Sequence, residues 1–203
     1  VCLASPLRDV YKRQANGRVT CVDAYHVCHD QVPPHALSVH LHGGTVLPGL
    51  TSYGSTLGLS DVPSESSASN GQDPSLLTRH LYLDTKRLVP RAEDGLIFGG
   101  HALRRAHASG VTTAVNVPAT IGMFGGVSTH FDTGARTVLD AHSVRTSEVA
   151  LHVRLAYPID DHEPSLATQL ALLRSLLRNP PPGSVEWHRV SRGEWPLVVK
   201  TNA

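Results

Sequence analysis

The sequence lacks the long apolar runs and the excess charge that mark membrane proteins and nucleic-acid-binding proteins. No apolar run approaches the ~20 residues that a membrane helix requires, and the N-terminus has no uninterrupted apolar core of the signal-peptide kind. The 18 Lys and Arg residues balance 17 Asp and Glu residues, so we expect neither nucleic acid nor an acidic membrane as partner. The compartment is left open, because nothing marks Val1 as a native N-terminus.

Cysteine is also scarce. Cys2, Cys21 and Cys28 are an odd number without the paired spacing of zinc ligands, so we expect free thiols and neither a disulfide framework nor a structural metal site. Stability must then come from an apolar core. A chain of 203 residues that is 40% hydrophobic can form one, but it is shorter than a typical closed eight-stranded barrel of ~250 residues.

The first 50 residues predict a tail followed by a small β element. Residues 1–14 show no regular apolar pattern and resemble translated adapter sequence, so we assign them to a non-native or disordered tail. Alternation predicts a strand at Arg18–Asp23 after the Asn16-Gly17 turn pair. Two further short strands are expected at residues 36–41 and 45–47, where glycine and proline separate the apolar runs.

The remainder predicts an α/β architecture. We expect residues 60–74 to form a long surface loop, which is either functional or disordered. The glycine-rich residues 122–128 lack the Lys-Ser/Thr ending of a phosphate loop and favour a tight turn beside a strand. The expected helices are at residues 102–108 and 164–179, and the expected strands are at 111–117, 147–155 and 196–199. This order favours parallel strand pairing through crossover connections.

Thirteen histidines make a metal site worth considering. The best candidate is the pair His40 and His42, because alternate residues of a strand face the same side and could share one metal. The alternative is a strand edge with two exposed imidazoles. We favour this alternative, because no third ligand is evident.

Five short motifs occur in an order that resembles a known family. They are GTVLPGL at residues 44–50, LGL at 57–59, SGVTTAV at 109–115, GG at 125–126 and PLVV at 196–199. Together they resemble the amidohydrolase superfamily, nearest its imidazolonepropionase-like branch, over roughly residues 16–203. The chain then corresponds to the N-terminal part of such a protein.

The resemblance implies a fold and an activity. We expect an α/β fold, with a β-sandwich portion at residues 15–50 and an incomplete (β/α)8 metal-dependent-hydrolase barrel at residues 51–203. Such enzymes activate water on one or two divalent metals, of which zinc is the expected one. The implied function is hydrolysis of a non-peptide carbon–nitrogen bond in a small molecule, with this chain inactive alone. The alternative is a non-catalytic relative that keeps the fold for binding or assembly. The oligomeric state is not predicted.

This chain departs from the family pattern where the first metal ligands belong. The His-x-His that follows Pro-Gly-Leu in the family falls here on Gly54 and Thr56, neither of which is a normal zinc ligand. Lys200 stands where the family commonly has a histidine, with Asn202 two residues further on. We therefore assign no metal ligand and no catalytic residue. We expect the Gly54 and Thr56 pair to lie close to Lys200 and Asn202. The pocket-lining candidates are Tyr53, Gly54, Thr56, Lys200 and Asn202.

The first prediction concerns zinc. Because a zinc site needs three or four converging His, Cys or carboxylate ligands, we expect the chain to bind zinc no more tightly than scattered surface histidines do. Calorimetric titration of the tag-free chain measures this. A stoichiometric site of about micromolar affinity or better, lost in the H40A/H42A double variant, would show that His40 and His42 are ligands.

Overall fold

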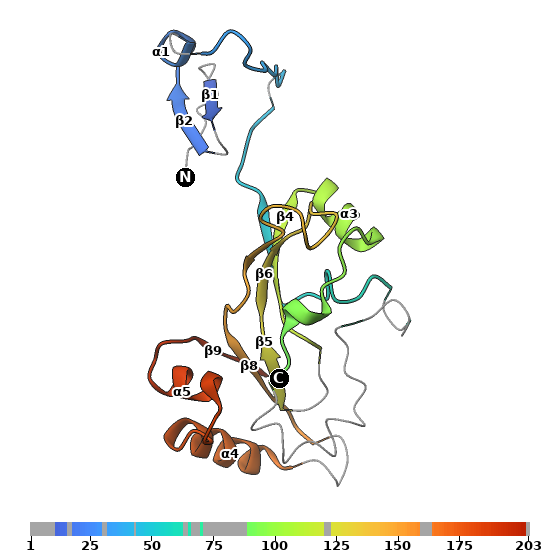
Figure 1. Ribbon diagram of the computed structural model, residues 1–203, viewed down its shortest axis with the longest axis vertical. Helices are drawn as coiled ribbons and strands as arrows, with labels where there is room; N and C mark the ends of the chain where they lie inside the picture. Colours follow the sequence, from blue (N-terminus) through green and yellow to red (C-terminus); the bar gives the residue numbers. More distant parts are fainter. Residues whose placement is uncertain are drawn as a thin grey trace. The chain divides into compact units, whose positions relative to one another are not determined.

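The chain forms two compact units, Val1–Pro48 and Gly49–Ala203, which are described separately (Figure 1). The computed structural model describes residues 11–15, 18–29, 32–42, 44–62, 65, 70, 89–119, 123–158 and 164–201. Within these residues no helix is both long enough and apolar enough to span a membrane.

The first unit is a hairpin followed by one helical turn. Strand β1, Tyr11–Ala15, pairs antiparallel with β2, Arg18–Asp23, and α1 spans Tyr25–His29. The strand expected at Arg18–Asp23 is confirmed. Residues 11–14, which we assigned to a tail, lie in β1.

Two further strand predictions in this unit are wrong. Residues 36–41 and 45–47 contain no strand, and every described residue from 32 to 49 is exposed. A strand needs a partner and a buried face, and alternation in the sequence supplies neither.

A disulfide joins Cys21 to Cys28, so the expectation of free thiols is wrong for these two residues. Cys2 lies outside the described residues. The turn after β2, in which the Asp23 carboxylate accepts a hydrogen bond from the Ala24 amide, brings α1 back against the strand. This places the two Cα atoms 5.8 Å apart, within bonding range. A spacing of seven residues does not reveal such a contact, because it depends on the direction in which the chain turns.

The second unit contains two sheets with mixed strand directions. The first, in the order β3-β4-β6-β7, has one parallel pair, between β3 and β4. The second, in the order β5-β8-β9, has a parallel pair between β8 and β9. The strands are β3 (Leu50–Tyr53), β4 (Val111–Asn116), β5 (Phe124–Val127), β6 (Thr129–Asp132), β7 (Val144–Thr146), β8 (Leu151–Leu155) and β9 (Leu197–Thr201). The expected mixed α/β class is confirmed.

Helices connect both parallel pairs. The 3-10 helix η3 (Ala92–Gly95) and α3 (His101–Ala108) lie between β3 and β4 in sequence, and α4 (Leu166–Arg178) and α5 (Val185–Ser191) lie between β8 and β9. The expected helices at residues 102–108 and 164–179 are thus present. Helix α5 was not predicted, because its seven residues follow Pro180-Pro-Pro and are too few for a clear apolar period.

Strands β5 and β6 are separated only by Ser128 and run as one bent strand from one sheet into the other. Ser128 stays paired at the bend: its amide donates to the Ala150 carbonyl, and its carbonyl accepts from the Val149 amide. The tight turn expected at residues 122–128 is therefore wrong for its described part, since Gly125 and Gly126 lie inside β5.

These glycines permit close backbone approach. A Cβ atom on Gly126 would lie 2.2 Å from the Pro90 carbonyl oxygen, and its φ of +91° disfavours any other residue. A Cβ atom on Gly125 would lie 3.0 Å from the Cβ atom of His152. The glycine pair thus marks a packing constraint and not a phosphate loop.

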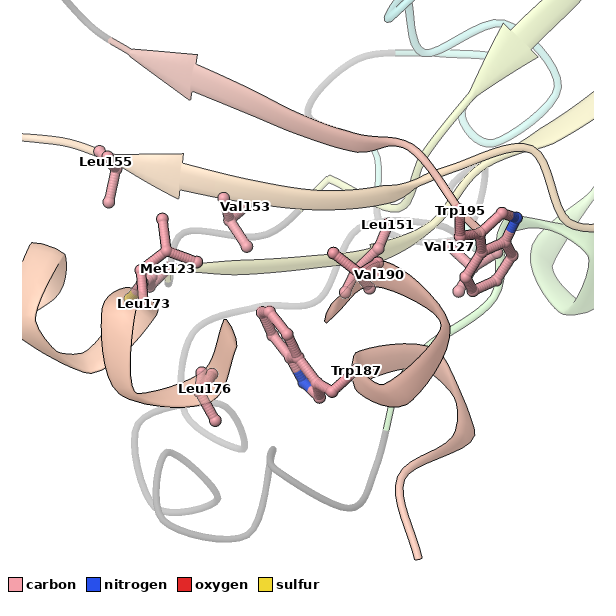
Figure 2. Close-up of a cluster of buried hydrophobic side chains, with 10 residues drawn as sticks. All are labelled: Met123, Val127, Leu151, Val153, Leu155, Leu173, Leu176, Trp187, Val190 and Trp195. Carbon is pink, nitrogen blue, oxygen red and sulfur yellow. The ribbon is translucent and has the colours of Figure 1, made fainter. Parts of the chain in front are cut away.

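Each sheet buries one face against helices. Figure 2 shows Trp187 of α5 among Leu151, Val153 and Leu176, between β8 and the two C-terminal helices. Trp187 is 1% exposed and its ring meets Phe124 edge to face. A smaller core joins Leu103 of α3 to Ala114 of β4 and Phe131 of β6.

We predict that Gly126→Ala destabilises the protein more than Gly110→Ala. Both glycines have φ of +91°, but a Cβ atom on Gly110 meets nothing within 4 Å. Gly110→Ala should cost about 1 kcal/mol from backbone strain, whereas Gly126→Ala adds a clash and should cost about 3 kcal/mol or more. Urea unfolding measures both, and equal midpoints would contradict the close approach to Pro90.

Candidate functional site

The sheet faces that the described helices leave uncovered carry the candidate site. In the first sheet Tyr53 is in register with Val115, which is in register with His130, so all three side chains share one face. The opposite face carries Ala114 and Phe131, which pack with α3. The candidate Tyr53 therefore lies on the side that the described helices leave uncovered.

The second sheet alternates in the same way. Leu151, Val153 and Leu155 of β8 face α4 and α5. His152 and Arg154 therefore point to the other face. Register places Lys200 of β9 beside Arg154, and residues paired across a ladder share a face.

Tyr53 and His152 bring these two faces into contact. Their ring centroids are 6.1 Å apart with the planes tilted by 31°. Because β3 and β8 belong to different sheets, this contact links the first sheet to the second. We call the surface defined by Tyr53, His152, Arg154 and Lys200 the inner face.

A buried asparagine holds the turn that follows β3. The Ser55 hydroxyl donates to Oδ1 of Asn116 at 3.2 Å, and Nδ2 of Asn116 donates to the Leu57 carbonyl. The Gly54 amide extends the ladder by donating to the Val115 carbonyl at 2.9 Å. Asn116 is 0% exposed, so one fully buried side chain fixes the backbone around Gly54 and Thr56.

Gly54 and Thr56 therefore lie just beyond the carboxyl end of β3, within this turn. Gly54 has φ of +70°, and a Cβ atom at this position would meet no other atom within 4 Å. Thr56 is exposed, and its carbonyl accepts hydrogen bonds from the amides of Leu59 and Ser60. Neither residue presents a side chain of metal-ligand type.

His152 is the residue with the most perturbed electrostatics on the inner face. It is 8% exposed, and its Nε2 atom has no hydrogen-bond partner among the described residues. Burial lowers the pKa of His152 from 6.5 to about 4, so the imidazole is neutral at pH 7. Burial, followed by the nearby Arg145, also lowers the pKa of His130, whose Nε2 atom likewise lacks a partner in the described part.

Tyr53 differs from His152 in being largely accessible. Its side chain is 56% exposed, so a solute can reach the phenol. Burial of part of the ring raises the pKa of Tyr53 above its ordinary value, and the hydroxyl is protonated at pH 7. The Tyr53 and His152 pair thus offers neutral hydrogen-bonding groups on a face that also carries cations.

Sequence reasoning named Tyr53 and Lys200 as pocket-lining candidates, which stays a prediction, and it did not single out His152 or Asn116. Lys200 lies on the inner face as His152 does, and Asn202 lies outside the described residues. The closeness of Gly54 and Thr56 to Lys200 stays a prediction. One sequence signal could have identified His152. The residue alternates with the apolar residues of Leu151–Leu155, and this alternation places it on the face turned away from the core.

Metal ligands do not gather in the described part of the chain. There, no three His, Cys, Asp or Glu side chains come close enough to hold a metal ion. His40 and His42 have ring centroids 6.3 Å apart, in a segment of the first unit that is not a strand.

Comparison with known proteins confirms the resemblance. No family model matches the chain. It is 33% identical over 150 residues, 68% of its length, to the amidohydrolase tasK of Hapsidospora irregularis, and it spans 14% of that protein. The chain is amidohydrolase-related. The crystal structure of an amidohydrolase from Thermotoga maritima matches its fold with a TM-score of 0.56 and 20% identity, over 90% of this chain and 41% of the other.

We predict that His152 makes this amidohydrolase-related chain less stable in mild acid. Because its folded pKa of about 4 lies below its ordinary 6.5, the unfolded state binds a proton first. The free energy of unfolding should therefore be unaffected above pH 7 and fall between pH 6.5 and 4, by up to roughly 3 kcal/mol from this group. Urea titrations of wild type and His152→Gln across this range measure the difference. Parallel pH profiles would show that His152 is not held neutral.

Proposed function

We propose that the protein is a hydrolase of a non-peptide carbon–nitrogen bond in a small molecule, and that this chain supplies part of its binding face. The observation that carries the proposal is the inner face, which lies at the carboxyl end of β3 beside a fixed turn. Both matched proteins are named amidohydrolases, which supports the same class of reaction. The chain spans 14% of the curated relative, so the activity of a protein of that length is our inference.

The proposal includes a barrel architecture. We infer that residues 51–203 belong to a (β/α)8 barrel and residues 15–50 to a β-sandwich portion, of the imidazolonepropionase-like branch. Two features support the barrel: helices connect each parallel strand pair, and the Tyr53 and His152 contact joins strands of two different sheets. Barrel enzymes form their sites at the carboxyl ends of the strands, where Gly54 lies.

Zinc, which the family relationship implies, does not fit the residues at this site. Gly54 has no side chain, the Thr56 hydroxyl is a poor zinc ligand, and the Lys200 ammonium must lose a proton before it can coordinate. We therefore derive no reaction step through a metal from these residues. Their contribution is binding: Tyr53 and His152 offer neutral polar groups, and Lys200 offers a positive charge.

The poor fit between these residues and zinc also favours a second, non-catalytic function. A non-catalytic relative would bind a small molecule or assemble with a partner. It requires the turn and the inner face but no set of metal ligands. Hydrogen bonds between Ser55, Asn116 and Leu57 stabilise the turn at Gly54, so its structure does not depend on a metal. This non-catalytic alternative predicts a folded protein without stoichiometric metal.

Metal content and turnover of the protein expressed from its whole reading frame separate the two functions. Amides, lactams and N-acyl amino acids are assayed with zinc and with EDTA, and bound metal is measured by atomic emission. EDTA-sensitive hydrolysis with stoichiometric metal supports the hydrolase. A folded, metal-free protein without turnover overturns it in favour of the alternative.

We predict that the 203-residue chain alone does not hydrolyse amides or esters. The two earliest ligand positions are Gly54 and Thr56, and no cluster of three metal-binding side chains is present among its described residues. Release of p-nitroaniline or p-nitrophenol by the purified chain, with and without added zinc, is the measurement. Turnover that depends on zinc and disappears with EDTA would contradict the prediction.

A further inference from the structure

His152 carries a buried nitrogen atom without a described partner. The residue is 8% exposed, and its Nε2 atom forms no hydrogen bond with the described residues. A buried polar atom in this state costs free energy, so native proteins satisfy nearly all such atoms with protein, water or ligand groups. A ligand that bonds this nitrogen is therefore a physical explanation of its position.

Four buried polar atoms lack a partner among the described residues, and His152 differs from the other three. These are Oγ of Ser60, Nε2 of His130 and Nε1 of Trp187. Trp187 lies inside a hydrophobic core and Ser60 is 4% exposed. Within the described part of the chain, His152 is the one of the four whose ring contacts an exposed aromatic side chain. Movement of that one side chain would open the imidazole to a solute.

Tyr53 is the exposed neighbour of His152. Their ring centroids are 6.1 Å apart, within the range of 4.5–7 Å that is usual for aromatic pairs. Tyr53 is 56% exposed, and it belongs to β3, which has a neighbouring strand on one side only among the described residues. Rotation of its side chain breaks no hydrogen bond to a described residue, because none of them bonds its hydroxyl.

His152, in contrast, is held in place. It lies on β8, the middle strand of its sheet, in register with Gly126 on one side and Val198 on the other. A Cβ atom on Gly125 would lie 3.0 Å from the Cβ atom of His152, so the strands are in close contact there. The imidazole is therefore the fixed member of the pair, and the phenol is the member that can move.

We propose that Tyr53 is a lid over His152, and that its rotation opens a binding site for a flat ring that carries an uncharged hydrogen-bonding group. This group bonds Nε2 of the imidazole, and the flat ring stacks against the phenol. The proposal names a ligand class for the inner face. It rests on the proposed function only where it takes this ligand to be the substrate.

The surroundings of His152 favour an uncharged ligand group. A charged group would lose its hydration beside a buried atom, and this is costly without an opposite charge. None of the ion pairs among the described residues includes His152 or Tyr53. Burial lowers the pKa of His152 to about 4, so at pH 7 the imidazole is neutral and its two nitrogens are one donor and one acceptor.

The lid is tested by the reactivity of His152 with diethyl pyrocarbonate at pH 7. A neutral imidazole nitrogen attacks a carbonyl carbon of the reagent, ethyl carbonate leaves, and the ring proton passes to water. Mass spectrometry of peptides gives the rate at each histidine. If the lid is open about one tenth of the time, Tyr53→Ala should raise the rate at His152 about tenfold.

Two matched variants and one internal control accompany this measurement. Tyr53→Phe keeps the ring and should leave the rate at His152 unchanged. Tyr157→Ala removes another exposed tyrosine, 72% exposed, and should also leave it unchanged. The rate at His130, whose Nε2 atom is also buried, should be the same in all variants, because loss of the fold would raise it together with the rate at His152.

The ligand class is tested with three probes. Benzamide has a flat ring and an uncharged amide, cyclohexanecarboxamide has the same amide without a flat ring, and benzoate has the ring with a charge. Each is titrated into the ¹⁵N-labelled 203-residue chain. We expect benzamide to shift the amides of β3 and β8, and to bind up to about tenfold more tightly than the other two, as one aromatic contact would produce. His152→Phe, which keeps the ring and removes the nitrogen, should weaken benzamide about tenfold.

Benzamide should also slow the reaction of wild-type His152 with diethyl pyrocarbonate, and this result does not depend on any variant. The proposal is overturned if benzamide binds without shielding His152, if the three probes bind equally, or if benzoate binds most tightly. Equal rates at His152 in wild type and Tyr53→Ala, or a parallel rise at His130, would overturn the lid. None of these measurements involves turnover, so failure of the lid and failure of the proposed hydrolase are distinguishable.

Discussion

The close approach of backbones at Gly125 and Gly126 is the constraint on which the second unit depends. At this point the bent strand from Phe124 to Asp132 contacts Pro90 on one side and β8 on the other, with no space for a Cβ atom at Gly126. The bend transfers one strand between two sheets without breaking its pairing. The strand therefore joins the two sheets, and each sheet packs its apolar residues against helices.

The two faces of each sheet carry different kinds of side chain. The outer faces bury Trp187, Phe131 and the leucines of α4, which supply the apolar burial that stabilises the fold. The inner face keeps Tyr53, His152, Arg154 and Lys200, whose polar groups a core could not accommodate without partners. The described helices cover the apolar faces and leave the inner face uncovered.

The turn after β3 is well defined in its backbone but lacks side chains that bind metal. The turn after β3 keeps its shape through Asn116, although Gly54 and Thr56 contribute no ligand side chain. The turn is stabilised by hydrogen bonds of Asn116 to Ser55 and Leu57. Its structure therefore does not depend on the side chains at positions 54 and 56.

The sequence by itself determined the elements whose signal is local. The β-branched run at Val111–Asn116, the amphipathic helix α4 and the family motif around Gly54 were all readable, because periodicity and short motifs report on neighbouring residues. Only the tertiary structure decided the rest. The Cys21 and Cys28 disulfide, the strand role of Gly125 and Gly126, and the meeting of Tyr53 with His152 depend on which distant segments pack together. Sequence spacing carries no direct information on such contacts, since they arise from chain direction and strand curvature.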